Sequence, residues 1–169
     1  MNNVGQFLEY STDGGETWSQ YSGSTQVTVP SGGSVKMRHL SSSGDFSPRS
    51  LNVQGSTGQW KASGNIMTLL DETGERTVLS DGYEFQYMFS DGGSNIVNIV
   101  DASELELPAT TIASNCYNSM FLACTSLTAA PAELPATTIS GDCYMYMFWG
   151  CQALTASPYI KAQQGSGCA

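Results

Sequence analysis

Few residues of this 169-residue chain could do nucleophilic, redox or metal chemistry, and their spacing decides what they could do. The candidates are one histidine and five cysteines: His39, Cys116, Cys124, Cys143, Cys151 and Cys168. A Cys/His catalytic pair or a zinc site needs a histidine or a C-x-x-C pair close to the thiols. No C-x-x-C occurs, and His39 ends a predicted strand far from the cysteines. We therefore expect no catalytic residue, no metal site and no cofactor.

A second chemical candidate is the stretch YSTDGGETW at residues 10–18. It spells S-x-D-x-G-x-T-W, which resembles the Asp-box of sialidases and related β-propellers. The box occurs once, and a propeller needs at least four blades of ~40–45 residues. Asp13-Gly14-Gly15 also supplies residues that accept positive φ between two strand-like stretches, so the pattern predicts a β-hairpin. Asp13 would then cap turn amides, and Trp18 would pack under the loop.

Sialidase chemistry would further need a cluster of arginines that binds the substrate carboxylate. The chain has three arginines, Arg38, Arg49 and Arg76, and nothing in their spacing gathers them. They are interpreted as solvated surface charges. A sialidase-like glycan-processing protein thus remains only a second alternative, resting on the Asp-box alone.

The amino-acid composition disfavours some classes of binding partner. The formal net charge is −9, from six basic and fifteen acidic residues, and the basic residues are scattered, which disfavours nucleic-acid binding. Only 12% of residues are charged, while Gly, Ser and Thr are abundant, a balance common in surface-exposed β-rich proteins and virion components. No apolar run reaches the ~18–20 residues of a membrane span. The N-terminal MNNVGQFLEY lacks the basic and apolar regions of a signal peptide.

The chain divides into two predicted parts. Residues 1–62 are expected to form a small all-β module with strands at 6–10, 17–21, 25–29, 34–39 and 50–54. The stretch Pro30-Ser31-Gly32-Gly33 marks one clear turn. Val27, Val29, Val35 and Met37 alternate with polar residues, so one face of this module should be buried.

Residues 63–169 repeat themselves. LPATTIASNCYNSMFLACTSLTAAP (107–131) aligns with LPATTISGDCYMYMFWGCQALTASP (134–158) at an offset of 27 residues, and Tyr87-Met88-Phe89 looks like a degenerate earlier copy. Within the first clear copy Tyr117, Met120, Phe121 and Cys124 fall at i, i+3, i+4 and i+7, which is one face of a two-turn helix. The second copy has the same spacing at Tyr144, Met147, Phe148 and Cys151, so two-turn helices are predicted at 117–124 and 144–151. The period predicts an α/β leucine-rich-repeat-like solenoid that ends within a repeat.

These motifs resemble a known family. ELPATT, CYxxMF and the cysteine-then-SLTxAP ending are similar to the BspA-like leucine-rich repeats of Bacteroidales and other gut bacteria. GNIMTLL after a YSTDGGxTW module is similar to the N-terminal part of such proteins. The resemblance implies a surface-associated repeat protein with a role in adhesion and in host or matrix binding. It implies no catalytic residues.

The cysteines follow the repeats. A helix between Cys116 and Cys124 would separate them by ~12 Å, beyond the ~4.4–6.8 Å that a disulfide spans. Equivalent cysteines of adjacent repeats would sit on helices ~8–10 Å apart, which is marginal for a bridge. We therefore favour reduced, buried, stacked thiols. Cys168 would occupy the same place in an unfinished third repeat, whose uncapped end could self-associate.

The two clear copies differ most on one side of the predicted helix. There the second copy carries Tyr146 and Trp149, which would expose aromatic area suited to a protein or glycan partner. The competing interpretation is that both rings shield the open end of the last complete repeat. Thr128 and Thr155 mark a second, polar candidate surface on the predicted strands.

The leading functional hypothesis is a non-enzymatic, surface-exposed binding or adhesion protein, outside the cell or at the cell surface. Its partner would be a protein or glycan on a host or neighbouring cell. The alternative is a phage virion protein, such as a tail or head-fibre component with a structural or receptor-binding role. A methionine start without a signal and the Gly/Ser/Thr-rich β-module motivate that alternative.

Overall fold

The chain folds into two compact units, each described here by itself. The computed structural model describes residues 8–21, 26–40, 58–90 and 98–162. The first unit comprises Met1–Pro48 and Met67–Arg76, and the second comprises Arg49–Ile66 and Thr77–Ala169.

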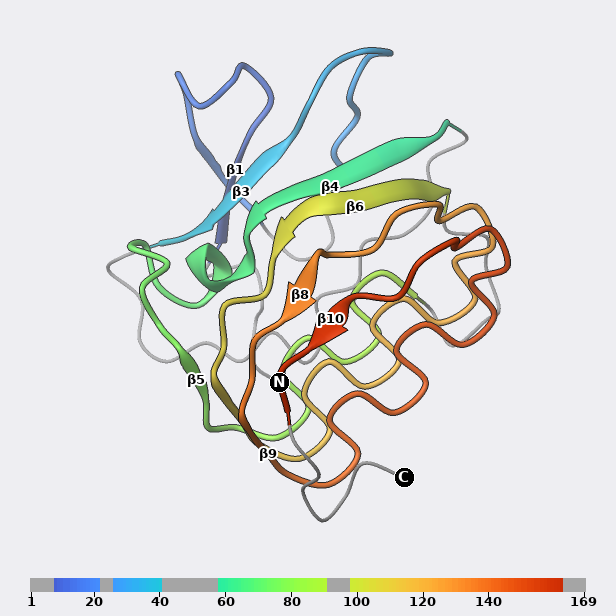
Figure 1. The fold of residues 1–169 in the computed structure, drawn as a ribbon. Coiled ribbons are helices and arrows are strands. Elements are labelled where there is room, and N and C mark those ends of the chain that lie inside the picture. The colour runs from blue at the N-terminus through green and yellow to red at the C-terminus, as the bar shows by residue number, and fades with distance from the viewer. Residues whose placement is uncertain (1–7, 22–25, 41–57, 91–97, 163–169) are drawn as a thin grey trace. The chain divides into compact units, whose positions relative to one another are not determined.

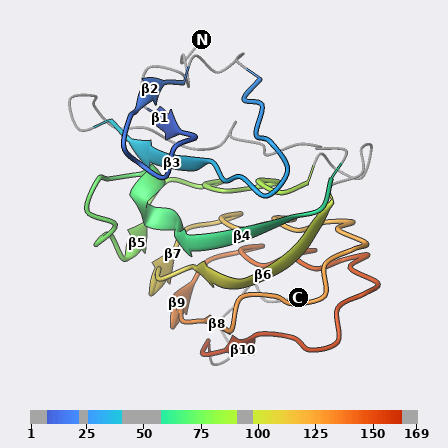
Figure 2. The same cartoon turned by 90° about the horizontal axis from the view of Figure 1, so that it is seen from above.

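The first unit is built on a three-stranded antiparallel sheet (Figure 2). Its strands are β1 (Leu8–Ser11), β2 (Ser19–Gln20) and β3 (Lys36–His39), in the order β2-β1-β3. Glu9 of the central strand faces Gln20 on one side and Arg38 on the other. The hairpin predicted around Asp13 is confirmed, because β1 and β2 pair directly across that loop.

The other strands predicted for the all-β module are found only in part. The predicted strand at 34–39 is present as β3. Residues 26–29 contain no strand, and the predicted strand at 50–54 lies outside the described residues. The predicted turn is present, since the Gly33 amide donates to the Pro30 carbonyl at 2.9 Å.

The second unit contains short parallel sheets whose partners lie far apart in the sequence (Figure 1). The longest pair joins β4 (Trp60–Asn65) to β6 (Ile99–Glu106). A second sheet has the order β5 (Val78–Leu79), β7 (Thr111–Ile112) and β9 (Thr138–Ile139), and a third pairs β8 (Glu133–Leu134) with β10 (Tyr159–Ile160). Thr111 faces Thr138, so the structure pairs the two copies at the 27-residue offset read from the sequence.

Three turn segments follow β5, β7 and β9. We call residues 82–89, 114–123 and 141–150 the first, second and third turn segments. Positive φ recurs at every second residue in part of the second segment, at Asn115, Tyr117 and Ser119. The Ser119 amide donates to the Met145 carbonyl of the third segment at 2.9 Å, whereas the next amide, that of Met120, donates within its own segment to Tyr117.

The two-turn helices predicted at 117–124 and 144–151 are therefore wrong. An α-helix requires negative φ at every residue, and the turn segments break that rule repeatedly. Isolated two-turn helices are also marginal, because nucleation costs more than a few internal hydrogen bonds return. Here every second amide of the second segment, from Asn115 to Ala123, donates instead to a neighbouring segment.

The predicted fold class, an all-β module followed by an α/β leucine-rich-repeat-like solenoid, is contradicted. Within the described residues the only helical element is the 3-10 helix η3 (Ile66–Leu69). Most of the strands are two to six residues long, and they form four separate small sheets. The sheet β2-β1-β3 is antiparallel, and the other three sheets are parallel. The described part of the chain is a mostly β structure of short strands and turns, and it shows no solenoid.

Aromatic rings pack between the turn segments to form the core of the second unit. Phe121 stacks on Phe89 at 5.1 Å and on Phe148 at 5.3 Å between ring centroids. Tyr117 is flanked in the same way by Phe85 at 5.8 Å and Tyr144 at 6.1 Å. The middle rings, Phe121 and Tyr117, are fully buried. The Met-Phe step read from the sequence thus marks the stacked positions of all three segments.

Candidate functional site

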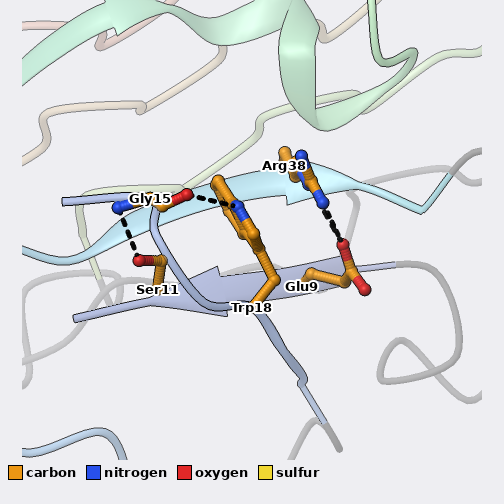
Figure 3. Close-up of polar contacts among 5 residues, drawn as sticks. All are labelled: Glu9, Ser11, Gly15, Trp18 and Arg38. Atoms are coloured by element: carbon orange, nitrogen blue, oxygen red, sulfur yellow. Dashed lines mark hydrogen bonds and ion pairs between the residues drawn. The ribbon is translucent and has the colours of Figure 1, made fainter. Parts of the chain in front are cut away.

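The Asp-box hairpin is a closed local network. The Ser11 hydroxyl donates to Asp13 Oδ1 at 2.7 Å and accepts from the Gly15 amide at 2.8 Å (Figure 3 shows the second contact). Asp13 also accepts from the Thr17 amide at 3.0 Å and from the Thr17 hydroxyl. These bonds, above all that from the Thr17 hydroxyl, hold the pKa of Asp13 well below its usual range. The carboxylate therefore caps the turn, as the sequence predicts.

Trp18 and Arg38 complete this network. The Trp18 indole Nε1 donates to the Gly15 carbonyl at 3.1 Å, and the Arg38 guanidinium carbon lies 3.9 Å from the centre of a Trp18 ring. Arg38 also forms an ion pair with Glu9 at 2.8 Å (Figure 3). Its guanidinium thus contacts a carboxylate and a ring of this protein. Of the other arginines, Arg49 lies outside the described residues.

The third turn segment carries the two aromatic residues predicted as a contact surface. Trp149 is 68% exposed and Tyr146 is 53% exposed. Their rings meet edge to face, with centroids 5.8 Å apart and planes at 76°. The structure therefore brings these two predicted residues together on the surface.

The two threonines of the predicted polar surface are also exposed. The Thr128 hydroxyl donates to the Val100 carbonyl at 2.8 Å, so it serves the fold. In the described residues neither Thr128 nor Thr155 forms a hydrogen bond with Tyr146 or Trp149.

Sequence reasoning missed an edge of backbone donors on the third turn segment. Amides of the second segment donate to the third: Ser119 to Met145, Phe121 to Met147 and Ala123 to Trp149, at 2.7–2.9 Å. The corresponding amides of the third segment belong to Tyr146, Phe148 and Gly150. Within the described residues these three amides have no hydrogen-bond partner. A row of backbone N–H groups therefore lies beside the exposed aromatic pair.

No sequence signal would have revealed this edge, because it arises from pairing between segments far apart in the chain. One partial signal exists: Gly150 replaces Ala123, and both have positive φ, at 78° and 60°. A glycine tolerates that conformation best.

The histidine and cysteines make no metal site in the described part of the chain, where no three His, Cys, Asp or Glu side chains cluster suitably. His39 is buried, and burial lowers its pKa. The four described cysteines are free thiols; Cys116, Cys124 and Cys143 are buried, and Cys151 is half-buried. Cys168 lies outside the described residues.

Comparison with known proteins returned no similar family model, no similar curated protein and no similar solved structure. The resemblance to BspA-like repeats therefore rests on the sequence motifs alone. In the described residues no helix has the length and apolar character needed to cross a membrane.

Proposed function

We propose that this chain is a non-enzymatic binding protein of the cell surface or extracellular space, and that its third turn segment contacts the partner. The observation that carries the proposal is the exposed pair Tyr146 and Trp149. Trp and Tyr are the residue types most often found at the energetic centre of protein interfaces. When a partner covers such a ring, apolar surface is removed from water, and this stabilises the complex by ~1.5–3 kcal/mol for a fully buried large side chain.

The backbone edge adds polar recognition to this apolar surface. The amides of Tyr146, Phe148 and Gly150 can donate to carbonyl or hydroxyl oxygens of a partner. Rings supply area and donors fix orientation, which is the combination that protein and glycan ligands need. A nucleic-acid partner is disfavoured, because the net charge of −9 would repel the phosphate backbone.

The test measures binding of the 169-residue chain to a glycan array and to whole cells, for the natural sequence and for the Trp149→Ala and Tyr146→Ala variants. We expect each substitution to weaken binding about tenfold, which corresponds to ~1.4 kcal/mol. Tyr87→Ala is the matched control. Tyr87 is 38% exposed and precedes the stacked Phe89 by two residues, as Tyr146 precedes Phe148.

Circular dichroism would establish that the variants keep the fold. An absence of binding to every glycan and cell type, or an equal loss in the Tyr87→Ala control, would count against the proposal. Binding to the array would identify a glycan partner, and binding only to cells in a protease-sensitive manner would identify a protein.

A further inference from the structure

The ends of the second and third turn segments bring two cysteines together. Cys124 directly follows the second segment, and Cys151 directly follows the third. Just before them the Ala123 amide donates to the Trp149 carbonyl at 2.7 Å. A Cβ placed on Gly150 would lie 3.3 Å from the Ala123 Cα. The two backbones are therefore in direct contact at this point.

Both cysteines form a hydrogen bond to the same backbone carbonyl. The Phe121 carbonyl accepts from the Cys124 amide and from the Cys151 thiol, both at 3.1 Å. The Cys124 thiol donates to the Phe89 carbonyl of the first segment at 3.3 Å. Backbones joined by ladder hydrogen bonds lie ~4.8 Å apart, which falls inside the ~4.4–6.8 Å between Cα atoms that a disulfide spans. The distance expected for packed helices, ~8–10 Å, does not apply, because the helices are absent.

The other cysteine pair provides an internal comparison. Cys116 and Cys143 are both buried, with 0% and 2% of their surface exposed. The Cys116 thiol donates to the Asp81 carbonyl at 3.3 Å, and the Cys143 thiol donates to the Ser140 carbonyl. Cys124 is likewise buried with its thiol on a backbone carbonyl, so the two pairs differ at the half-buried Cys151, which a solution oxidant can reach.

We propose that Cys124 and Cys151 form a disulfide between the two repeats when the protein meets a disulfide oxidant, with Cys151 as the attacking thiol. Cys151 is the more accessible of the two. The adjacent Cys124 thiol lowers the pKa of Cys151 and favours its thiolate, while the adjacent Cys151 and burial raise the pKa of Cys124. Oxidising conditions prevail outside cells, although the proposal does not depend on the partner-binding function.

The chemistry balances with glutathione disulfide as the oxidant. The Cys151 thiolate attacks one sulfur of glutathione disulfide, forms a mixed disulfide and releases one glutathione thiolate. Cys124 then loses its proton, and its sulfur attacks Cys151 Sγ and releases the second glutathione thiolate. Two protein thiols are oxidised to one disulfide, and one glutathione disulfide is reduced to two glutathiones.

The experiment uses the full chain with Cys168→Ser, so that a cysteine outside the described residues does not compete. The folded protein is incubated with glutathione disulfide, its free thiols are alkylated, and the products are digested after glutamate and sequenced by mass spectrometry. Glu133 lies between the two cysteines, so a bridge joins two otherwise separate peptides. We expect a single disulfide, Cys124–Cys151, and a melting temperature higher by about 5 °C or more.

Single variants test the order of events. In Cys124→Ser we expect a stable glutathione adduct on Cys151, because no second thiol resolves it. In Cys151→Ser we expect no adduct on Cys124, and the double variant Cys116→Ser/Cys143→Ser should still form the bridge. Four free thiols after oxidation of the folded protein, or a bridge between Cys116 and Cys143, would overturn the proposal.

Discussion

The rings of Phe121 and Phe148 stack with their centroids 5.3 Å apart and their planes inclined by only 7°. The two residues hold the same position in the two clear copies of the repeat. The Phe121 amide also donates to the Met147 carbonyl at 2.9 Å, so side chain and backbone join the copies at the same place. Identical residues from successive repeats are therefore the contacts that hold the turn segments together.

Removing the middle ring of this stack should be more damaging than removing the end ring. Phe121 is fully buried between two rings, whereas Phe148 is half-buried. We expect Phe121→Ala to lower the free energy of unfolding by about 3–5 kcal/mol, and Phe148→Ala by about half as much because less apolar area leaves the core. Urea unfolding measures both. Equal losses would show that the stack does not order the segments as described.

The sequence predicts those parts of the fold that depend on local chemistry or on self-similarity. Ser11, Asp13 and Gly15 predict the hairpin because all their partners lie within a few residues. The 27-residue offset predicts the pairing of Thr111 with Thr138, because equal residues occupy equal positions. The exposure of Trp149 is also predictable from self-similarity, because this position differs between the copies and holds Leu122 in the first.

The helices could not be rejected from the sequence. Tyr117, Met120, Phe121 and Cys124 share one side in a helix, and they are equally buried in the turn segment that forms instead. What decides between the two is a set of backbone hydrogen bonds to residues more than twenty positions away. Periodicity within one copy carries no information about such bonds. The donor edge of the third segment was missed for the same reason.

Gly150 should be sensitive to an added methyl group. Its φ is +78°, and a Cβ there would approach the Ala123 Cα to 3.3 Å. We expect Gly150→Ala to lower the free energy of unfolding by about 1 kcal/mol or more, because alanine is strained at positive φ. Gly141→Ala is the control, since no atom lies within 4 Å of its added Cβ. Thermal unfolding of the two variants should differ, and a control loss as large as that at Gly150 would contradict the strain argument.

Asp13 should make the hairpin sensitive to acid. Its folded pKa lies below the ordinary value of 3.8, chiefly because the Thr17 hydroxyl donates to the carboxylate. A depressed pKa contributes stability that is present above pH 3.8 and is lost as the pH falls through the folded value. We expect the NMR signal of the Trp18 indole N–H to keep its hairpin shift at neutral pH and to lose it in strong acid. In Asp13→Asn this acid transition should be absent; an identical transition in both proteins would assign it to another group.

Cys116 should give the second unit the opposite, alkaline sensitivity. Burial raises the pKa of its thiol from 9.0 to about 11. Below pH 9 the thiol is protonated in both the folded and unfolded chains, so it contributes no pH dependence. Between pH 9 and pH 11 the unfolded chain releases this proton while the folded chain keeps it, so the free energy of unfolding falls as the pH rises, by at most about 1.4 kcal/mol per pH unit.

Cys116→Ala should lower stability at every pH, because it leaves a small cavity, and should also flatten the alkaline slope. Urea unfolding at several pH values measures both effects, and the difference in slope isolates Cys116 from Tyr117, whose pKa burial also raises. A variant with the slope of the natural chain would show that the Cys116 thiol ionises as easily in the fold as in the unfolded chain.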